Sequence, residues 1–190
     1  MPSQHSLPLR HRHPIFIGVA GRMGSGKTSA ARYLSTKYGF QYTRYSQVLQ
    51  DWRSACDADR GRLQTLGWDV MAGGLQTELN TRLIAGIDRL RSAAVDGIRH
   101  RTDFDSLSRS LGESFSMIFL EASPQRRFDR LRDRFETFAE FAAADSHPVE
   151  SHIDGLKPLA RLTISTEHSL ESLYNQLDAW LAACAEEEQT

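Results

Sequence analysis

Residues 21–28 read Gly21-Arg22-Met23-Gly24-Ser25-Gly26-Lys27-Thr28, and this stretch decides the fold of the 190-residue chain. It matches the phosphate-binding pattern G-x-x-x-x-G-K-[ST] in every position. The three glycines allow backbone angles that a side chain forbids, so the loop can turn its N–H groups toward a phosphate. Lys27 brings positive charge to the β- and γ-phosphates, and the Thr28 hydroxyl can bind Mg²⁺. The pattern predicts that the phosphates of a nucleotide are bound by Gly21, Met23, Gly24, Ser25, Gly26, Lys27, Thr28 and Ser29.

The residues on either side of this loop, the P-loop, support the motif. Residues 14–20 (PIFIGVA) form a short apolar run, as expected of a buried strand. Residues 28–38 have helical spacing, with Ala30, Ala31 and Leu34 along one side. Strand, glycine loop and helix together aim a helix N-terminus at an anion. This context favours a phosphate site over a chance glycine-rich turn.

The rest of the chain alternates between strand and helix patterns. Further strands are expected at 40–45, 93–97, 116–120 and 161–165. Helices are expected from an N-cap at Ser46 to about residue 54, over 75–91, after a cap at Thr102 or Asp103, from Ser123-Pro124, and over 169–184. Residues 57–74 suggest a short helix with loops, and 135–149 are ambiguous. Alternation of this kind predicts an α/β fold with a five-stranded parallel sheet and helices on both faces, in three layers.

Composition indicates one domain, over 14–184, with a flexible tail at 1–13 and an acidic tail at 185–190. A net charge of −1 gives no reason to expect binding to nucleic acid or membranes. No apolar run reaches the length of about 18 residues that a membrane span needs. Residues 1–13 lack the apolar core of a secretory signal. The two cysteines, Cys56 and Cys184, form no metal or redox motif, so we expect unpaired thiols and a cytoplasmic protein.

Asp96 is the second candidate site residue. It lies at the carboxyl end of a predicted strand, where α/β sheets place ligands. An Asp-Gly pair often only shapes a turn, but beside a P-loop an acidic Mg²⁺ partner is favoured. Arg99 follows three residues later, and Arg62 lies between the second and third strands. Either guanidinium could grip a phosphate with two hydrogen bonds or lie solvated on the surface.

A cluster of arginines follows the fourth strand, and we expect one or two of them to be functional and the others solvated. A functional member could swing over a triphosphate as a lid and stabilise the transferring charge. The cluster comprises Arg126, Arg127, Arg130, Arg132 and Arg134. Trp52 and Trp68 flank the segment where an acceptor would lie; we expect packing roles, with stacking on a base as the alternative.

Together these elements resemble the nucleoside-monophosphate-kinase-like group of small P-loop kinases, and within it the dephospho-CoA kinases and bacteriophage deoxynucleoside monophosphate kinases. The resemblance runs from about residue 15 to 181 and involves the P-loop, 62–67 (RLQTLG), 95–99 (VDGIR), 122–124 with Arg127, Arg130 and Arg134, and 159–171. The Asp-Gly-x-Arg element is also similar to the Asp-Gly-Phe-Pro-Arg of adenylate kinases, whose arginine holds the acceptor phosphate.

The resemblance implies strand order 2-3-1-4-5, ATP with Mg²⁺ as donor, an acceptor-binding segment at about 46–74 and a lid at about 126–150. On this reading, the protein phosphorylates a nucleoside or deoxynucleoside monophosphate, its nucleotide-like small-molecule partner. Lys27, Asp96, Arg130 and Arg134 are catalytic, Thr28 and Asp96 hold the metal, and Arg62 and Arg99 bind the acceptor.

Three departures keep alternatives open. Relatives often carry an acid after the second strand, where this chain has Tyr45-Ser46-Gln47. Residues 135–145 are poor in arginine, and Ala160-Arg161 replaces the usual Ala-Asp. One alternative is a kinase with a hydroxyl acceptor such as dephospho-CoA, with Asp51 as base. The other is a regulatory protein that binds nucleotide without catalysis.

Overall fold

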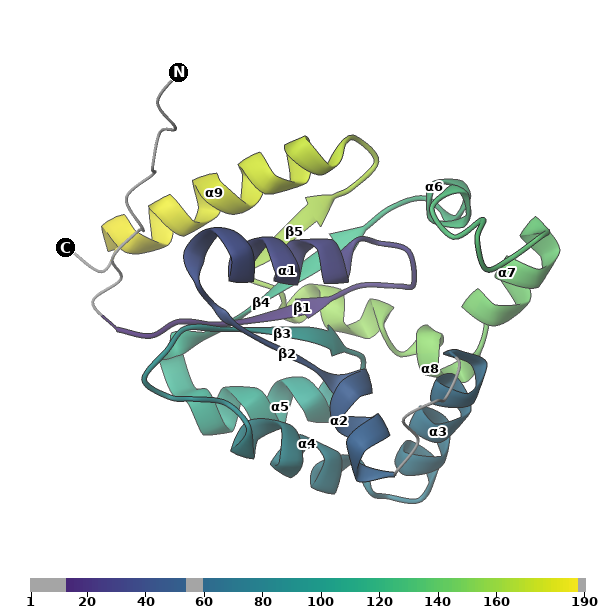
Figure 1. Cartoon of the computed structure of the whole chain (residues 1–190), viewed down its shortest axis with the longest axis horizontal. Coiled ribbons are helices and arrows are strands. Elements are labelled where there is room, and N and C mark those ends of the chain that lie inside the picture. Colours follow the sequence, from purple (N-terminus) through teal and green to yellow (C-terminus); the bar gives the residue numbers. More distant parts are fainter. Residues whose placement is uncertain (1–12, 54–59, 188–190) are drawn as a thin grey trace.

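A five-stranded parallel sheet forms the centre of the molecule, in the order β2-β3-β1-β4-β5 (Figure 1). The computed structural model describes residues 13–53 and 60–187. β1, the strand before the P-loop, has all of its residues buried and lies between β3 and β4. The strands are β1 (Phe16–Ala20), β2 (Gln41–Arg44), β3 (Ala93–Ile98), β4 (Phe115–Glu121) and β5 (Leu162–Ser165). The expected fold class and strand order are confirmed.

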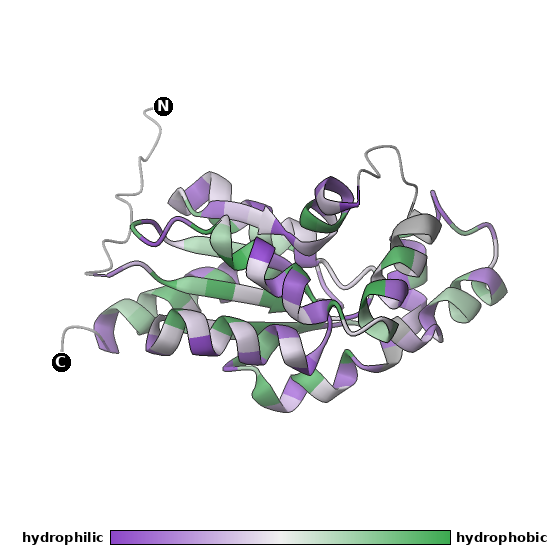
Figure 2. Ribbon diagram, turned by 90° about the horizontal axis from the view of Figure 1, so that it is seen from below, coloured by the Kyte–Doolittle hydropathy of each residue, from purple (hydrophilic) through white to green (hydrophobic). Residues whose placement is uncertain are grey.

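Helices cover both faces of the sheet, because the strand side chains alternate between two hydrophobic clusters. Ile17 and Val19 of β1 face α1 (Lys27–Tyr38) and α9 (Leu170–Glu187). Phe16 and Ala20 face the opposite layer, which contains α2 (Tyr45–Trp52), α4 (Gln76–Ala85) and α5 (Arg101–Leu111). Figure 1 shows α1 and α9 on one side of the sheet and α4 and α5 on the other, and Figure 2 shows hydrophilic and hydrophobic residues interleaved along these helices.

The remaining helices gather at the end of the sheet where β1 enters the P-loop (Figure 1). They are α3 (Arg60–Ala72), α6 (Pro124–Asp129), α7 (Phe138–Asp145) and α8 (Pro148–Ser151), followed by the 3₁₀ turn η2 (Asp154–Leu159). A second 3₁₀ turn, η1 (Gly112–Ser114), lies at the opposite end of the sheet, where it leads from α5 into β4. Ser123 caps α6 with Pro124 at its first position, as predicted. The ambiguous stretch 135–149 contains α7, which begins with a capping box between Thr137 and Glu140.

Two predicted helix limits in the first half of the chain are wrong. The helix expected over 75–91 ends at Ala85, and Leu90 is 88% exposed. The Asp88 carboxylate accepts the Leu90 N–H at 2.9 Å, and this local turn replaces the helical pattern. Ser46 is not an N-cap, because α2 begins at Tyr45, directly after β2. The Tyr45 ring is buried and its hydroxyl donates to Asn80 at 2.6 Å, which fixes the start of α2.

Two further limits differ at α5 and α9. The N-cap of α5 is His100 rather than Thr102 or Asp103. Asp103 completes the cap from the third helical position, where its carboxylate accepts the His100 N–H at 3.0 Å. α9 continues through Glu187, past the expected end at residue 184. The limits of the domain and its tails stay predictions, and Cys56 lies outside the described residues.

Candidate active site

The P-loop has the backbone that its glycines predict. Gly21 and Gly24 have φ of 139° and 75°, a region that side chains disfavour. A Cβ on Gly21 would lie 2.3 Å from the Leu120 carbonyl oxygen, so the loop passes directly against β4. α1 begins at Lys27, which places a helix N-terminus at the end of the loop.

Cationic side chains hold the first carbonyl groups of the loop. Lys27 Nζ donates to the Arg22 carbonyl at 2.8 Å. Arg127 Nη1 donates to the Met23 carbonyl at 3.3 Å. In a planar trans peptide unit, the C=O of one residue and the N–H of the next point in opposite directions. A side chain that holds the carbonyl therefore also fixes the direction of the following N–H.

The next two carbonyls are held in the same way by residues of the second half of the chain. Arg130 Nη1 donates to the Gly24 carbonyl at 3.2 Å, and Thr166 Oγ1 donates to the Ser25 carbonyl at 3.0 Å. Arg130 also bonds the Thr166 carbonyl, which joins the two anchors. Burial lowers the pKa of Arg130, with the charge of Arg126 as a smaller cause. Side chains therefore hold four consecutive carbonyls of the P-loop, and three of these side chains come from the second half of the chain.

A buried ion pair supports these anchors. Arg127 is 3% exposed and makes two hydrogen bonds to Asp145, at 2.5 and 2.8 Å. Asp145 also accepts from Arg22 at 3.1 Å, and Arg22 makes further bonds to Asp154. Hydrogen bonding to Asp154 raises the pKa of Arg22, and the same bond lowers the pKa of Asp154.

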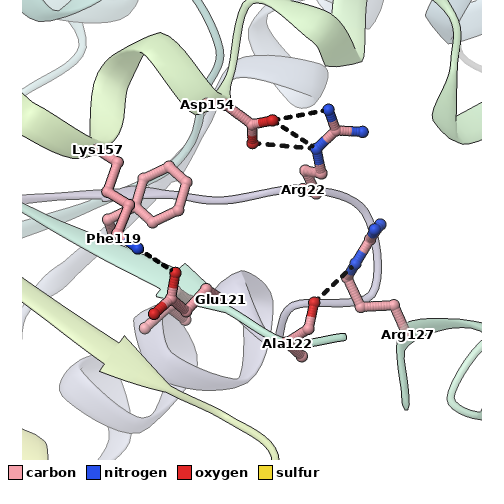
Figure 3. A pocket seen from close by; sticks show the side chains of 8 residues that line it. Arg22, Phe119, Glu121, Ala122, Arg127, Asp154 and Lys157 are labelled. Atoms are coloured by element: carbon pink, nitrogen blue, oxygen red, sulfur yellow. Dashed lines mark hydrogen bonds and ion pairs between the residues drawn. The ribbon is translucent and has the colours of Figure 1, made fainter. Parts of the chain in front are cut away.

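A cleft of about 310 Å³ lies beside this pair (Figure 3). Arg22 points to Asp154 on one side of it, and Lys157 bonds Glu121 at 2.6 Å on the other. Because these charged side chains already satisfy one another, we assign the cleft no ligand.

Thr28 and Asp96 meet where the metal is expected. Thr28 Oγ1 donates to Asp96 Oδ2 at 2.8 Å, and the Asp96 residue is 2% exposed. Tyr42 of β2 donates to the same oxygen at 3.0 Å, and burial, followed by the charge of Asp96, raises the Tyr42 pKa. Mg²⁺ prefers oxygen ligands and is usually held by one or two carboxylates, waters and substrate phosphates. A carboxylate and a hydroxyl beside the P-loop fit that ion.

Arg99 is linked to the P-loop by a residue that the sequence did not single out. Arg99 Nη1 bonds Glu150 Oε1, and Glu150 Oε2 accepts the Met23 N–H at 3.1 Å. Glu150 is 1% exposed. It lies on α8, directly after the ambiguous stretch 135–149, and a single Glu at such a place gives no signal in the sequence.

The expected site residues are thus only partly brought together. Lys27, Thr28, Asp96 and Arg130 converge on the P-loop. Arg134 does not: its side chain is 36% exposed and lies 3.8 Å from Asp133. The side chain of Arg62, in α3, lies outside the described part. Ser25 is fully buried, and within that part its Oγ has no hydrogen-bond partner.

A second cleft, of about 570 Å³, opens between the α3–α4 turn, the start of α5 and η2. It includes Met71 and Gly74 of the expected acceptor segment. The His100 and His152 rings, 5.8 Å apart, also line it. Burial is the main cause that lowers the pKa of His100.

The two tryptophans of the acceptor segment pack within the protein. Trp52 lies under the guanidinium groups of Arg53 and Arg82, at 4.3 and 5.0 Å from the ring centre. Trp68 contacts His147 edge to face, at 5.9 Å between ring centres. These contacts are those expected of packing residues.

Two negative findings concern the described residues alone. Over 13–53 and 60–187, no group of three or more His, Cys, Asp or Glu residues is arranged to hold a metal. None of the helices in that part is long and apolar enough to cross a membrane.

No protein family and no curated protein matches the chain in sequence. Solved structures do match in shape. A gluconokinase from Sinorhizobium meliloti 1021 has a TM-score of 0.62 and 17% identity, over 94% of this chain and 97% of that one. Shikimate kinase from Acinetobacter baumannii, in complex with shikimate, has a TM-score of 0.64 and 16% identity, over 90% and 94%.

The Mycobacterium tuberculosis APS kinase, in complex with AMPPNP and APS, has a TM-score of 0.60 and 13% identity, over 90% of this chain and 98% of that one. At these identities the similarity shows a shared fold. The chain has the fold of small P-loop kinases over nearly their whole length.

Proposed function

We propose that this protein is an ATP- and Mg²⁺-dependent phosphotransferase that phosphorylates a nucleoside or deoxynucleoside monophosphate. The observation that carries the proposal is the contact between Thr28 and Asp96 beside a complete P-loop. Asp96 lies in the carboxyl half of β3, and Thr28 lies at the start of α1, which follows the neighbouring strand β1 and the P-loop. Parallel α/β sheets bind their ligands at this end. The kinases of similar fold, one of them in complex with AMPPNP, support ATP as the donor.

In this proposal the P-loop N–H groups and Lys27 hold the β- and γ-phosphates. Thr28 and Asp96 hold Mg²⁺, which neutralises charge on the phosphates when bound. Arg130 fixes the loop and adds positive charge, and Arg62 and Arg99 bind the acceptor. Catalysis then consists mainly of positioning and electrostatic stabilisation, as phosphoryl transfer generally requires.

The surroundings of Gln47 support a phosphate acceptor over a hydroxyl. A hydroxyl nucleophile benefits from a positioned base, whereas a monophosphate is already anionic at neutral pH. Gln47 stands where an acid would be expected, and its Nε2 donates to Asp51 Oδ1 at 2.8 Å. The carboxylate of the alternative base, Asp51, is therefore engaged on the exposed side of α2.

A hydroxyl acceptor remains the second candidate because Glu150 places a carboxylate beside the P-loop. An assay of ADP release with nucleoside monophosphates, deoxynucleoside monophosphates and dephospho-CoA separates the candidates. We expect turnover with at least one monophosphate, and none by Lys27→Ala at an unchanged melting temperature. Full turnover by a folded Lys27→Ala protein would remove the P-loop from the mechanism.

A further inference from the structure

Glu150 is a buried carboxylate that the proposed mechanism does not use. Its two oxygens have different partners: Oε1 bonds Arg99, at the end of β3, and Oε2 accepts the Met23 N–H of the P-loop at 3.1 Å. The Glu150 side chain thus connects the P-loop with Arg99, the arginine proposed to bind the acceptor. A guanidinium and a loop N–H are also the two kinds of donor that bind phosphate oxygens.

We propose that Glu150 occupies the position of the acceptor's phosphate in the ligand-free protein, and that the acceptor must displace it from Arg99. This inference rests on the proposed function, since it concerns the same acceptor site. Glu150 then sets acceptor affinity as an internal competing anion. It makes Arg99 available only to a ligand whose anionic group outcompetes a carboxylate.

Burial supports this role. A carboxylate that is 1% exposed is tolerated only while charged donors surround it. The Arg99 side chain, at 34% exposure, remains open to a ligand. A phosphate that approached Arg99 while Glu150 stayed in place would put two anions side by side, which is unfavourable in a site of low dielectric. Phosphate binding and the Arg99–Glu150 bond therefore exclude each other.

The segment that carries Glu150 is held at both ends. Asp145 before it and Asp154 after it both bond Arg22 of the P-loop. Between them lies α8, a helix of four residues. Release of Glu150 thus requires only a local change of this segment, while the two flanking ion pairs keep it beside the P-loop.

The test measures binding of inorganic phosphate by calorimetric titration, because this probe does not depend on the identity of the acceptor. Glu150→Gln should bind phosphate about tenfold more tightly than the wild type, a gain of about 1.4 kcal/mol. The matched control is Glu113→Gln, which removes one exposed carboxylate on η1 and should bind like the wild type.

Two double variants show whether the gain requires Arg99. Glu150→Gln with Arg99→Gln should lose the gain. Glu150→Gln with Arg101→Gln should keep it, because Arg101 pairs with Asp105 instead. Unchanged affinity in Glu150→Gln, or a gain that survives the loss of Arg99, would overturn the proposal.

If Glu150→Gln does not fold, a crystal structure of the wild type with bound phosphate tests the proposal instead. The proposal requires phosphate on Arg99 and Glu150 turned away from it; a Glu150 that still bridges Arg99 and Met23 beside bound phosphate would refute it. Turnover of monophosphates is measured separately. If no monophosphate is phosphorylated but Glu150→Gln still binds phosphate more tightly than the wild type, the proposed function fails. The inference that Glu150 competes with phosphate for Arg99 then stands.

A drop in kcat for Glu150→Gln of about a hundredfold or more, with an unchanged acceptor KM, would identify Glu150 as a base instead. That result would also overturn the proposal.

Discussion

Arg127 shows how far a single residue's role depends on its surroundings. In the sequence it is one of five arginines between 126 and 134, of which one or two are expected to act on phosphate. In the structure its guanidinium bonds Asp145 and the Met23 carbonyl and is almost fully buried. Arg127 positions the P-loop through the Met23 carbonyl, and the carboxylate of Asp145 balances its buried charge.

Asp145→Asn should therefore be strongly destabilising. It leaves the Arg127 charge buried without its anion, and breaking such a pair generally costs about 3–5 kcal/mol. Urea unfolding measures the loss. Asp133→Asn, at a carboxylate that is 73% exposed, is the control and should change stability by less than about 0.5 kcal/mol. Equal free energies of unfolding for the two variants would mean that the Arg127–Asp145 ion pair does not hold the P-loop.

Gly21 and Gly39 provide a matched test of the loop's close packing. Both have positive φ, 139° and 74°, but a Cβ at Gly39 has nothing within 4 Å, whereas one at Gly21 would meet the Leu120 carbonyl. Gly39→Ala should cost about 1–2 kcal/mol, from backbone conformation alone. Gly21→Ala should cost clearly more and weaken ATP binding. Thermal melts and ATP titrations compare the two, and similar losses would argue against the close approach of the P-loop to β4.

At the scale of elements, the N-cap residue of α5 makes the stability of the fold depend on pH. His100 is the N-cap, and burial is the first cause that holds its pKa below the usual 6.5, with His152 and Arg99 lowering it further and Asp103 opposing. Between the folded pKa and about 6.5 the unfolded chain binds more protons than the folded one. This contribution to stability is therefore lost as the pH falls below about 6.5.

His100→Asn should remove this dependence and keep the cap, since Asn is a favoured N-cap residue. Between pH 7.5 and 5.5 the wild type should lose more free energy of unfolding than the variant, by at most about 1.4 kcal/mol per pH unit. Urea unfolding at both pH values checks this. Parallel losses in the two proteins would show that His100 does not titrate on unfolding.

The sequence predicts elements best where one local signal dominates. Glycines and flanking hydrophobic residues define the P-loop, β1 and α1, and Ser123-Pro124 marks the start of α6. Prediction fails where side chains compete with the pattern, as at Asp88 after α4 and at the buried Tyr45 that begins α2. The segment with α7 and α8 has no clear periodicity in the sequence. Its acidic residues Asp145 and Glu150 form ion pairs with arginines elsewhere in the chain, and a local pattern does not show such pairs.

At the scale of the whole molecule, the candidate site is assembled from residues that are far apart in sequence. Thr28 and Asp96 come together because β1 and β3 are neighbours in the sheet, and the P-loop motif predicts that pair. Glu150 reaches Met23 across 127 positions, and no local pattern encodes that contact. The P-loop and the Thr28–Asp96 contact were thus predictable, whereas the groups that anchor the loop and bond Arg99 were not.

We propose that this protein transfers the γ-phosphoryl group of ATP to the phosphate of a nucleoside monophosphate. Phosphorus NMR of a reaction with ATP, Mg²⁺ and each monophosphate in turn tests it directly, because it identifies the atom that receives the group. We predict the paired signals of a nucleoside diphosphate derived from the acceptor, absent with Lys27→Ala. A new phosphomonoester, as on the hydroxyl of dephospho-CoA, or orthophosphate as the only product would contradict the claim.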